Sequence, residues 1–312
     1  MLSMRRLGPL AAAGGAMAGA AYLCWPAEPP KTLTPGRPLV CPVQSKQWVS
    51  SEAVRLRFEL PSPTATLGLP VPGHIMVVDA ATNYRPYSPV SLETPGYFEL
   101  LVRKYPGGEF STQLARLEPG DSATFYGPVE SRYRYERGAT KELGLVAAGT
   151  GITPMWQMIQ TALADPKDTT KITLVYASTS PDRILLKEEL DQAAAAHPDR
   201  FRACYVVSRQ GKTSQSLEGA ISGMRLGRIN EELLRAELPP APDPTNDEQT
   251  SCHIVVSGPE TMLRELCGPR ARDGGVHDQP GINYPDERRP RHPAIGGVLR
   301  QLGYRSNQVT WL

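Results

Sequence analysis

The sequence predicts two folded domains of different class, an antiparallel β-barrel followed by an α/β domain built on a parallel sheet. Short alternating runs broken by Pro and Gly fill residues 41–128, as half-buried antiparallel strands do. In the second half, apolar β-branched runs alternate with helical runs, a pattern typical of a parallel sheet covered on both faces. A chain of 312 residues accommodates two domains after a terminal segment. The predicted boundaries are 1–38 for that segment, 39–138 for the barrel and 139–312 for the α/β domain.

Composition excludes several classes of protein. Hydrophobic residues make up 40% of the chain and charged residues 21%, with a net charge of +2, so a nucleic-acid or other polyanionic partner is not expected. The five Cys are scattered without CxxC spacing, and the five His show no ligand spacing. We therefore expect no metal site, no disulfide framework and a reducing environment for the bulk of the chain.

The N-terminus predicts a membrane segment. Arg5 and Arg6 precede residues 7–25, which carry no charge, and a span needs roughly 20 residues. The basic start favours a cytoplasmic N-terminus, and the Pro-rich stretch 26–38 suits a tether. A cleaved secretory signal, a mitochondrial signal-anchor and a disordered tail stay open. The short, weakly hydrophobic run favours the mitochondrial outer membrane or intermembrane space, with the endoplasmic reticulum as the alternative.

The barrel half contains a motif with three chemically distinct side chains, Arg85-Pro86-Tyr87-Ser88. Arginine offers a fixed cation with a fork that suits phosphate. Tyrosine offers an aromatic face for a planar ring, and serine a hydroxyl that can donate to a ring nitrogen. The alternative is a Pro-rich turn with a surface arginine. The barrel strands are expected at 54–60, 74–78, 97–103 and 122–126.

A Gly turn lies in the stretch 106–112, which contains Gly107, Gly108, Phe110 and Ser111, and an amphipathic pattern opens at Leu114. Backbone N–H groups at a helix start attract a phosphate, so this turn is a second candidate site. A plain loop followed by a capped helix is the alternative.

The central feature of the α/β half is an apolar strand that runs into the turn Gly149-Thr150-Gly151 and then a helix. Thr153 can cap that helix and Pro154 suits its first position. A turn of this kind can hold a pyrophosphate on its N–H groups; an ordinary strand-to-helix turn is the alternative.

The remaining elements extend the alternation. We expect strands at 171–177, 201–208 and 253–259, helices at 185–196, 230–238 and 260–267, an exposed polar insertion at 268–293, and a last helix and strand within 295–312. Ligands bind at the carboxyl ends of parallel strands. Here those ends are 149–153, 176–179, 208–209 and 257–259.

Taken in order, these motifs resemble the ferredoxin–NADP reductase superfamily, and within it most closely the NADH–cytochrome b5 reductase family. The resemblance covers 42–312 and is carried by 85–88, 107–111, 149–155, 184–186, 257–259, 303–304 and Trp311. It implies an FAD-binding barrel followed by a pyridine-nucleotide domain. The implied reaction passes a hydride from NADH to FAD and then single electrons to cytochrome b5 or a similar haem protein. A monomer is expected.

The resemblance also implies roles for single residues. Arg85 would pair with the FAD pyrophosphate, Tyr87 would pack on the isoalloxazine, and Ser88 would lie near flavin N5. Ser88, Thr153 and Ser257 are the implied catalytic residues. The residues implied to contact FAD or the nicotinamide nucleotide are Arg85, Pro86, Tyr87, Ser88, Arg103, Gly107, Gly108, Phe110, Ser111, Gly149, Gly151, Thr153, Pro154, Ser208, Arg209, Gly258 and Pro259.

The chain departs from the family pattern in three places. Ser257 stands where the family usually has Cys before Gly-Pro, so we expect a changed rate rather than no reaction. Ser208 and Arg209 replace the acid that NADH-selective members often have; such an acid would repel a 2′-phosphate, whereas this pair could accept one. Use of NADPH therefore stays open, as does a plain surface role for Arg209. Trp311 replaces the terminal aromatic Phe, with Leu312 beyond it.

Two alternatives to this function remain. One is an NADPH-using reductase of the same superfamily with another acceptor, such as a quinone or a desaturase system. The other is a catalytically silent, membrane-tethered interaction module, suggested by the Cys-to-Ser change and the polar insertion. The sequence has no plant-type ferredoxin Cys pattern, which excludes a fused iron–sulfur domain.

Overall fold

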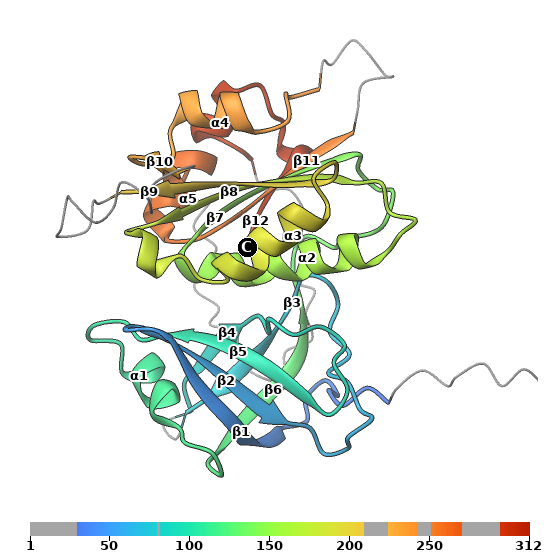
Figure 1. Cartoon of the computed structure of the whole chain (residues 1–312), viewed down its shortest axis with the longest axis vertical. Coiled ribbons are helices and arrows are strands. Elements are labelled where there is room, and N and C mark those ends of the chain that lie inside the picture. The colour runs from blue at the N-terminus through green and yellow to red at the C-terminus, as the bar shows by residue number, and fades with distance from the viewer. Residues whose placement is uncertain (1–29, 80–81, 209–223, 243–250, 270–293) are drawn as a thin grey trace, which may run out of the picture.

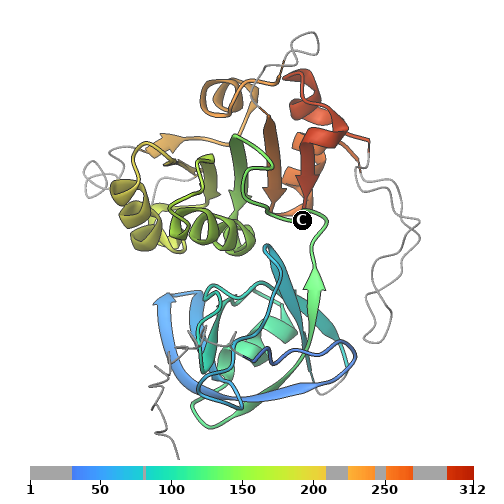
Figure 2. The same ribbon diagram turned by 90° about the vertical axis from the view of Figure 1, so that its right-hand side faces the viewer.

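The computed structural model describes residues 30–79, 82–208, 224–242, 251–269 and 294–312. These residues form two six-stranded sheets. The first sheet and its helix occupy the lower half of the molecule in Figure 1, and the second sheet with its helices occupies the upper half. The view in Figure 2 shows the same two layers from the side.

The first sheet is antiparallel throughout its described ladders. Its strand order is β4-β3-β6-β1-β2-β5, and it curls around its own core (Figures 1 and 2). The core includes Phe58, Phe98 and Phe125, whose ring centroids lie 4.9–5.2 Å apart. Helix α1 (Glu109–Arg116) packs Leu114 into the same core. The strands are β1 (Leu39–Ser50), β2 (Ala53–Glu59), β3 (Gly73–Val78), β4 (Tyr84–Tyr87), β5 (Tyr97–Arg103) and β6 (Ser122–Glu130).

The second sheet is parallel, with the strand order β10-β9-β8-β7-β11-β12. Successive residues of a strand point to opposite faces, so Leu145 belongs to the core under helices α2 and α3, whereas Val146 belongs to the core under α4, α5 and α6. The strands are β7 (Glu142–Ala148), β8 (Lys171–Ser178), β9 (Phe201–Val207), β10 (Met224–Leu226), β11 (Cys252–Ser257) and β12 (Val309–Trp311). The helices are α2 (Ile152–Ala164), α3 (Lys187–Ala196), α4 (Glu231–Glu237), α5 (Glu260–Cys267) and α6 (Gly297–Gln301).

The predicted fold class is confirmed for both sheets. Strands β1, β4 and β10 were not predicted, and the motif that begins at Arg85 supplies most of β4. One local expectation was wrong. Helix α2 begins at Ile152, so Thr153 lies inside it rather than capping it, and Pro154 is its third residue.

The expected membrane segment, 7–25, and most of the expected insertion, 268–293, lie outside the described residues. In the part of the chain that the structure describes, no helix has both the length and the apolar character needed to cross a bilayer.

Candidate active site

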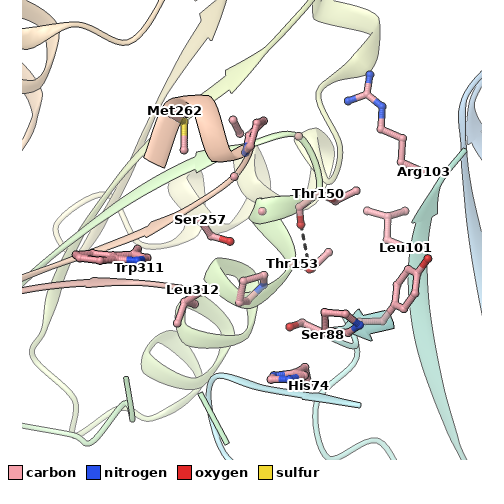
Figure 3. A pocket seen from close by; sticks show the side chains of 18 of the residues that line it. His74, Ser88, Leu101, Arg103, Thr150, Thr153, Ser257, Met262, Trp311 and Leu312 are labelled. Atoms are coloured by element: carbon pink, nitrogen blue, oxygen red, sulfur yellow. Dashed lines mark hydrogen bonds between the residues drawn. The ribbon is translucent and has the colours of Figure 1, made fainter. Parts of the chain in front are cut away.

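A large cleft lies between the two domains. Its volume is about 2030 Å³, compared with roughly 300–1,000 Å³ for a site that holds one small ligand. It is lined by β4, β5 and the start of α1 on the barrel side, and by the carboxyl ends of the parallel strands on the other. Figure 3 shows Leu101 and Arg103 of β5 facing Thr150 and Thr153 of the sheet domain. The cleft is therefore large enough for two extended cofactors.

The barrel wall of the cleft is aromatic and carries a cation. The rings of Tyr87 and Phe110 stack with their centroids 6.4 Å apart and their planes at 22°. The Arg85 guanidinium carbon lies 5.8 Å from the Phe110 ring centroid, and Arg85 Nη1 donates to the Tyr84 carbonyl at 2.8 Å. Burial raises the pKa of Tyr87 to about 12, so its phenol stays neutral and can donate a hydrogen bond.

The start of helix α1 is a tight turn that needs glycine. Gly107 has φ +74°, and a Cβ on Gly108 would lie 2.8 Å from Ser111 Oγ. That hydroxyl accepts from the Tyr105 N–H and donates to the Gly108 carbonyl, each at 3.3 Å. Among the described residues no side chain caps this helix, so its first N–H groups remain free for an anion.

The sheet wall of the cleft has a second such turn, at residues 149–151. Gly149 has φ +57°, and a Cβ on Gly151 would lie only 2.3 Å from the Ser257 carbonyl oxygen. Within the described structure, the first turn of α2 has neither an acid nor a capping side chain. Because Gly149 and Gly151 have no side chains, the backbone of this turn can come close to a ligand. The uncapped N–H groups at the start of α2 favour a phosphate there.

Hydrogen bonds hold this second turn in place from both domains. Thr153 Oγ1 donates to the Thr150 carbonyl at 3.1 Å (Figure 3), and Tyr176 Oη donates to the Gly149 carbonyl at 2.9 Å. Thr150 Oγ1 lies 3.1 Å from the hydroxyl of Tyr105 on the barrel side. The turn is thus tied both to its own sheet and to the opposite domain.

A carboxylate at the domain boundary positions Arg103. Glu52 Oε2 accepts from Arg103 Nη2 at 3.1 Å, and Glu52 Oε1 accepts from Arg183 Nη2 of the other domain at 2.5 Å. A Cβ on Gly149 would lie 3.5 Å from Arg103 Nη1. Glu52 therefore fixes a cation beside the turn of the sheet domain.

The floor of the cleft comes from the ends of two neighbouring strands. Ser257, which is buried, ends β11, and a Cβ on Gly258 would lie 2.6 Å from Met262 Cε. Trp311 pairs with Val256 in the ladder between β11 and β12, and both Trp311 and Leu312 line the cleft (Figure 3). The last aromatic residue therefore lies next to Ser257.

The structure brings together almost every residue that the sequence suggested. All of the expected catalytic and cofactor residues line this cleft except Arg209, which lies outside the described residues. Thr150 and Thr179 also line the cleft, and they lie within the strand ends 149–153 and 176–179 that the sequence marked. Lining residues that were not suggested include His74, Tyr105, Arg228 and Met262. Arg228 follows β10, which the sequence did not reveal.

These residues fit FAD and a pyridine dinucleotide. The aromatic wall suits a flavin ring, Arg85 suits its pyrophosphate, and each glycine turn offers an uncapped helix start. Two turns on opposite walls match two dinucleotides. Among the described residues, no cluster of His, Cys, Asp and Glu could hold a metal ion.

Comparison with known proteins agrees with this assignment. Residues 40–135 match the model of the oxidoreductase FAD-binding domain, and residues 145–268 match that of the oxidoreductase NAD-binding domain. NADH-cytochrome b5 reductase 1 of Eremothecium gossypii is 41% identical over 66% of this chain and 69% of its own length. NADH-cytochrome b5 reductase 2 of Emericella nidulans is 33% identical over 93% of this chain and 83% of its own.

A solved structure shows the same fold. The cytochrome b5 reductase domain of Ulva prolifera nitrate reductase superposes with a TM-score of 0.65 and 28% identity, covering 75% of this chain and 92% of that one. With an FAD-binding and an NAD-binding domain and relatives at this level of identity, the chain belongs to the NADH–cytochrome b5 reductase family of flavoprotein oxidoreductases.

Proposed function

We propose that the chain takes electrons from NADH through bound FAD and passes them singly to cytochrome b5 or a similar haem protein. The observation that carries this proposal is the shared cleft, in which the aromatic wall of the barrel faces the glycine turn of the sheet. FAD supplies the chemistry when bound, since it accepts a two-electron hydride and can release electrons one at a time. The relatives' names support cytochrome b5 as the acceptor.

The chain's own residues would bind and orient FAD and the nicotinamide nucleotide. Arg85 would hold the FAD pyrophosphate and Phe110 with Tyr87 would support its ring system. Ser88 would donate a hydrogen bond at flavin N5, and Thr153 with Ser257 would position the nicotinamide. Trp311 and Leu312 would exclude water from that end of the cleft.

The direct test is anaerobic reduction of the purified FAD-loaded chain by NADH, followed at the flavin absorbance band, and then addition of oxidised cytochrome b5. We expect bleaching of the flavin and reduction of the haem. A colourless protein that does not take up added FAD would favour the silent module, and a flavin reduced by NADH that does not reduce the haem would point to another acceptor.

Flavin retention tests the site itself. Arg85→Ala should lower the FAD content of the purified protein, because it removes the cation from the aromatic wall. Arg116→Ala is the matched control, since Arg116 is exposed in the last turn of α1 and does not line the cleft. Full flavin occupancy in Arg85→Ala would contradict the role given to Arg85.

We further propose that residues 7–25 anchor the chain to a membrane, at the mitochondrial outer membrane or within the intermembrane space. The anchored protein would be a monomer with domains at 39–138 and 139–312. The uncharged run after Arg5 and Arg6 supports this proposal. Cell fractionation of the full chain, compared with a chain that starts at Thr32, tests it. Recovery of both in the membrane-free fraction, or of the full chain in the endoplasmic reticulum, would contradict it, as would a dimer by light scattering.

A further inference from the structure

One end of the cleft carries a cation that the assigned site does not use. This end is formed by the carboxyl ends of β8 and β9 and by the turn after β10. Its lining residues are Ser178, Thr179, Ser208, Gly227 and Arg228. Among these described residues none is acidic, so this end combines hydroxyl groups with a single guanidinium.

The fold places these residues at one edge. Ser178 and Leu226 both pair with Val207 of β9, the strand that lies between β8 and β10. The Ser208 N–H donates to the Ser178 carbonyl at 3.1 Å, and the Gly227 N–H donates to the Val207 carbonyl at 2.9 Å. Ser208 and Arg228 therefore follow strands that end at the same level.

The turn that carries Arg228 is held on both sides. Gly227 has φ +119°, a value that favours glycine and turns the chain after β10. Ile229 is buried in the core under α4, and Asn230 Oδ1 caps α4 by accepting from the Leu233 N–H at 2.9 Å. The Arg228 side chain is thus exposed on a fixed turn.

Neighbouring arginines differ from Arg228 in how their charge is used. Arg202 Nη1 and Arg225 Nη2 lie 2.6 and 3.1 Å from the carboxylate oxygens of Glu237. Within the described residues Arg228 has no such ion pair. Its guanidinium therefore remains available to an anionic group in the cleft.

A dinucleotide whose pyrophosphate lay on the start of α2 would run along the carboxyl edge of the sheet, from β7 towards β9 and β10. Its adenosine ribose would then lie at the Arg228 end. An acid there would hydrogen-bond the two ribose hydroxyls of NADH, whereas an arginine there suits the 2′-phosphate of NADPH.

We propose that Arg228 is a specificity-determining residue that binds the 2′-phosphate of NADPH, so that the nucleotide site accepts NADPH as well as NADH. The proposal rests on the proposed function of this cleft as the nucleotide site. The proposal gives Arg228 a role in choosing between NADPH and NADH, whereas the name of the family mentions NADH alone.

The test measures binding rather than turnover. Adenosine 2′,5′-bisphosphate and adenosine 5′-monophosphate are titrated calorimetrically into the FAD-loaded full chain. We expect the bisphosphate to bind about tenfold more tightly, as one charge-assisted hydrogen-bonded pair allows, and this preference to weaken with added salt. Arg228→Gln should abolish the preference, and Arg228→Lys should restore part of it because the charge returns without the fork.

Arg225→Gln is the matched control, because Arg225 lies on β10, three residues before Arg228, does not line the cleft and pairs with Glu237. Equal affinity for the two ligands in the unmodified chain, or a preference that survives Arg228→Gln, would overturn the inference while the nucleotide site itself stands. Binding of neither ligand, together with no flavin reduction by NADH, would instead overturn the proposed function.

Discussion

The side chain of Gln157 accepts a hydrogen bond from the backbone N–H of Gly73, with Oε1 and N 2.8 Å apart. This contact joins helix α2 of the sheet domain to strand β3 of the barrel. The other end of the amide, Nε2, donates to the Pro89 carbonyl at 2.8 Å. Gln157 is fully buried, so one side chain satisfies two backbone groups of the opposite domain just behind the cleft.

Replacing Gln157 with Leu should therefore destabilise the contact between the domains. The change leaves the Gly73 N–H and the Pro89 carbonyl buried without partners, each at a cost of about 1–3 kcal/mol. We expect a lower urea midpoint and weaker flavin retention. Gln160→Leu is the matched control on the same helix, because Gln160 Oε1 has no hydrogen-bond partner among the described residues. Equal midpoints for the two variants would contradict the role of Gln157.

Glu52→Gln should raise the KM for NADH. The change removes the negative charge between Arg103 and Arg183 and so leaves two cations close together at the domain boundary. Because these side chains are partly exposed, the loss of unfolding free energy should be about 1 kcal/mol or less, whereas Arg103 loses the partner that orients it.

Glu118→Gln is the control for that variant. It also removes one ion pair, with Lys46, but Glu118 does not line the cleft. Steady-state kinetics with NADH decides the question. An unchanged KM in Glu52→Gln, or an equal rise in Glu118→Gln, would show that Glu52 does not position Arg103.

The local spacing of apolar residues predicted much of the fold, because it indicates which side chains of a strand or helix are buried. Strand β5 and helix α5 were predicted with the bounds that the structure shows, since each has a clear two-residue or helical period. Strand β1 was missed because its sequence, with Pro42 and Lys46, lacks a regular period, and most of its residues are exposed.

In the candidate site too, features with a local sequence signature were predicted and features without one were missed. Glycine turns and the motif at Arg85 have sequence signatures, so the sequence located them. Glu52 has none, because its partner Arg183 lies 131 residues away along the chain. Contacts of this kind arise only when the two sheets pack together, and they decide where Arg103 and Thr150 lie in the cleft.

Gly151→Ala should impair use of NADH more than it impairs stability. Gly151 has φ −60° and ψ −8°, values that alanine adopts readily, but its Cβ would lie 2.3 Å from the Ser257 carbonyl oxygen. Neither group is the end of a flexible side chain, so the turn must shift at the helix start. Misplacement of about 1 Å can cost on the order of 100-fold in rate, and we expect kcat/KM for NADH to fall by that order.

Gly138→Ala is the control that distinguishes the contact of a Cβ at Gly151 with the Ser257 carbonyl oxygen from a general loss of stability. Gly138 has φ +76° with nothing within 4 Å of a Cβ, so alanine there costs about 1 kcal/mol of backbone strain away from the cleft. It should lower the thermal midpoint and leave NADH kinetics alone. If Gly151→Ala shows only the same loss of thermal stability, the close approach to Ser257 has no part in nucleotide binding.

Alkaline pH should unfold the protein through its buried hydroxyl and thiol groups. Burial raises the pKa of Tyr87 to about 12 from an ordinary value of 10.0, and that of Cys41 and Cys252 to about 12 from 9.0. Burial, with a hydrogen bond to Asp191, likewise raises the pKa of Tyr205. The folded state therefore keeps these protons at a pH where the unfolded chain releases them.

Proton linkage determines whether the free energy of unfolding rises or falls with pH. A group with a raised folded pKa contributes stability that is complete below its unfolded pKa and is lost as pH rises towards its folded pKa. The free energy of unfolding should thus be level up to about pH 9 and then fall steadily to about pH 12. Urea midpoints measured from pH 8 to 11.5 test this, with Tyr205→Phe as the comparison. That variant removes one such proton, so its decline should be shallower; parallel declines would mean that the Tyr205 proton is not coupled to folding.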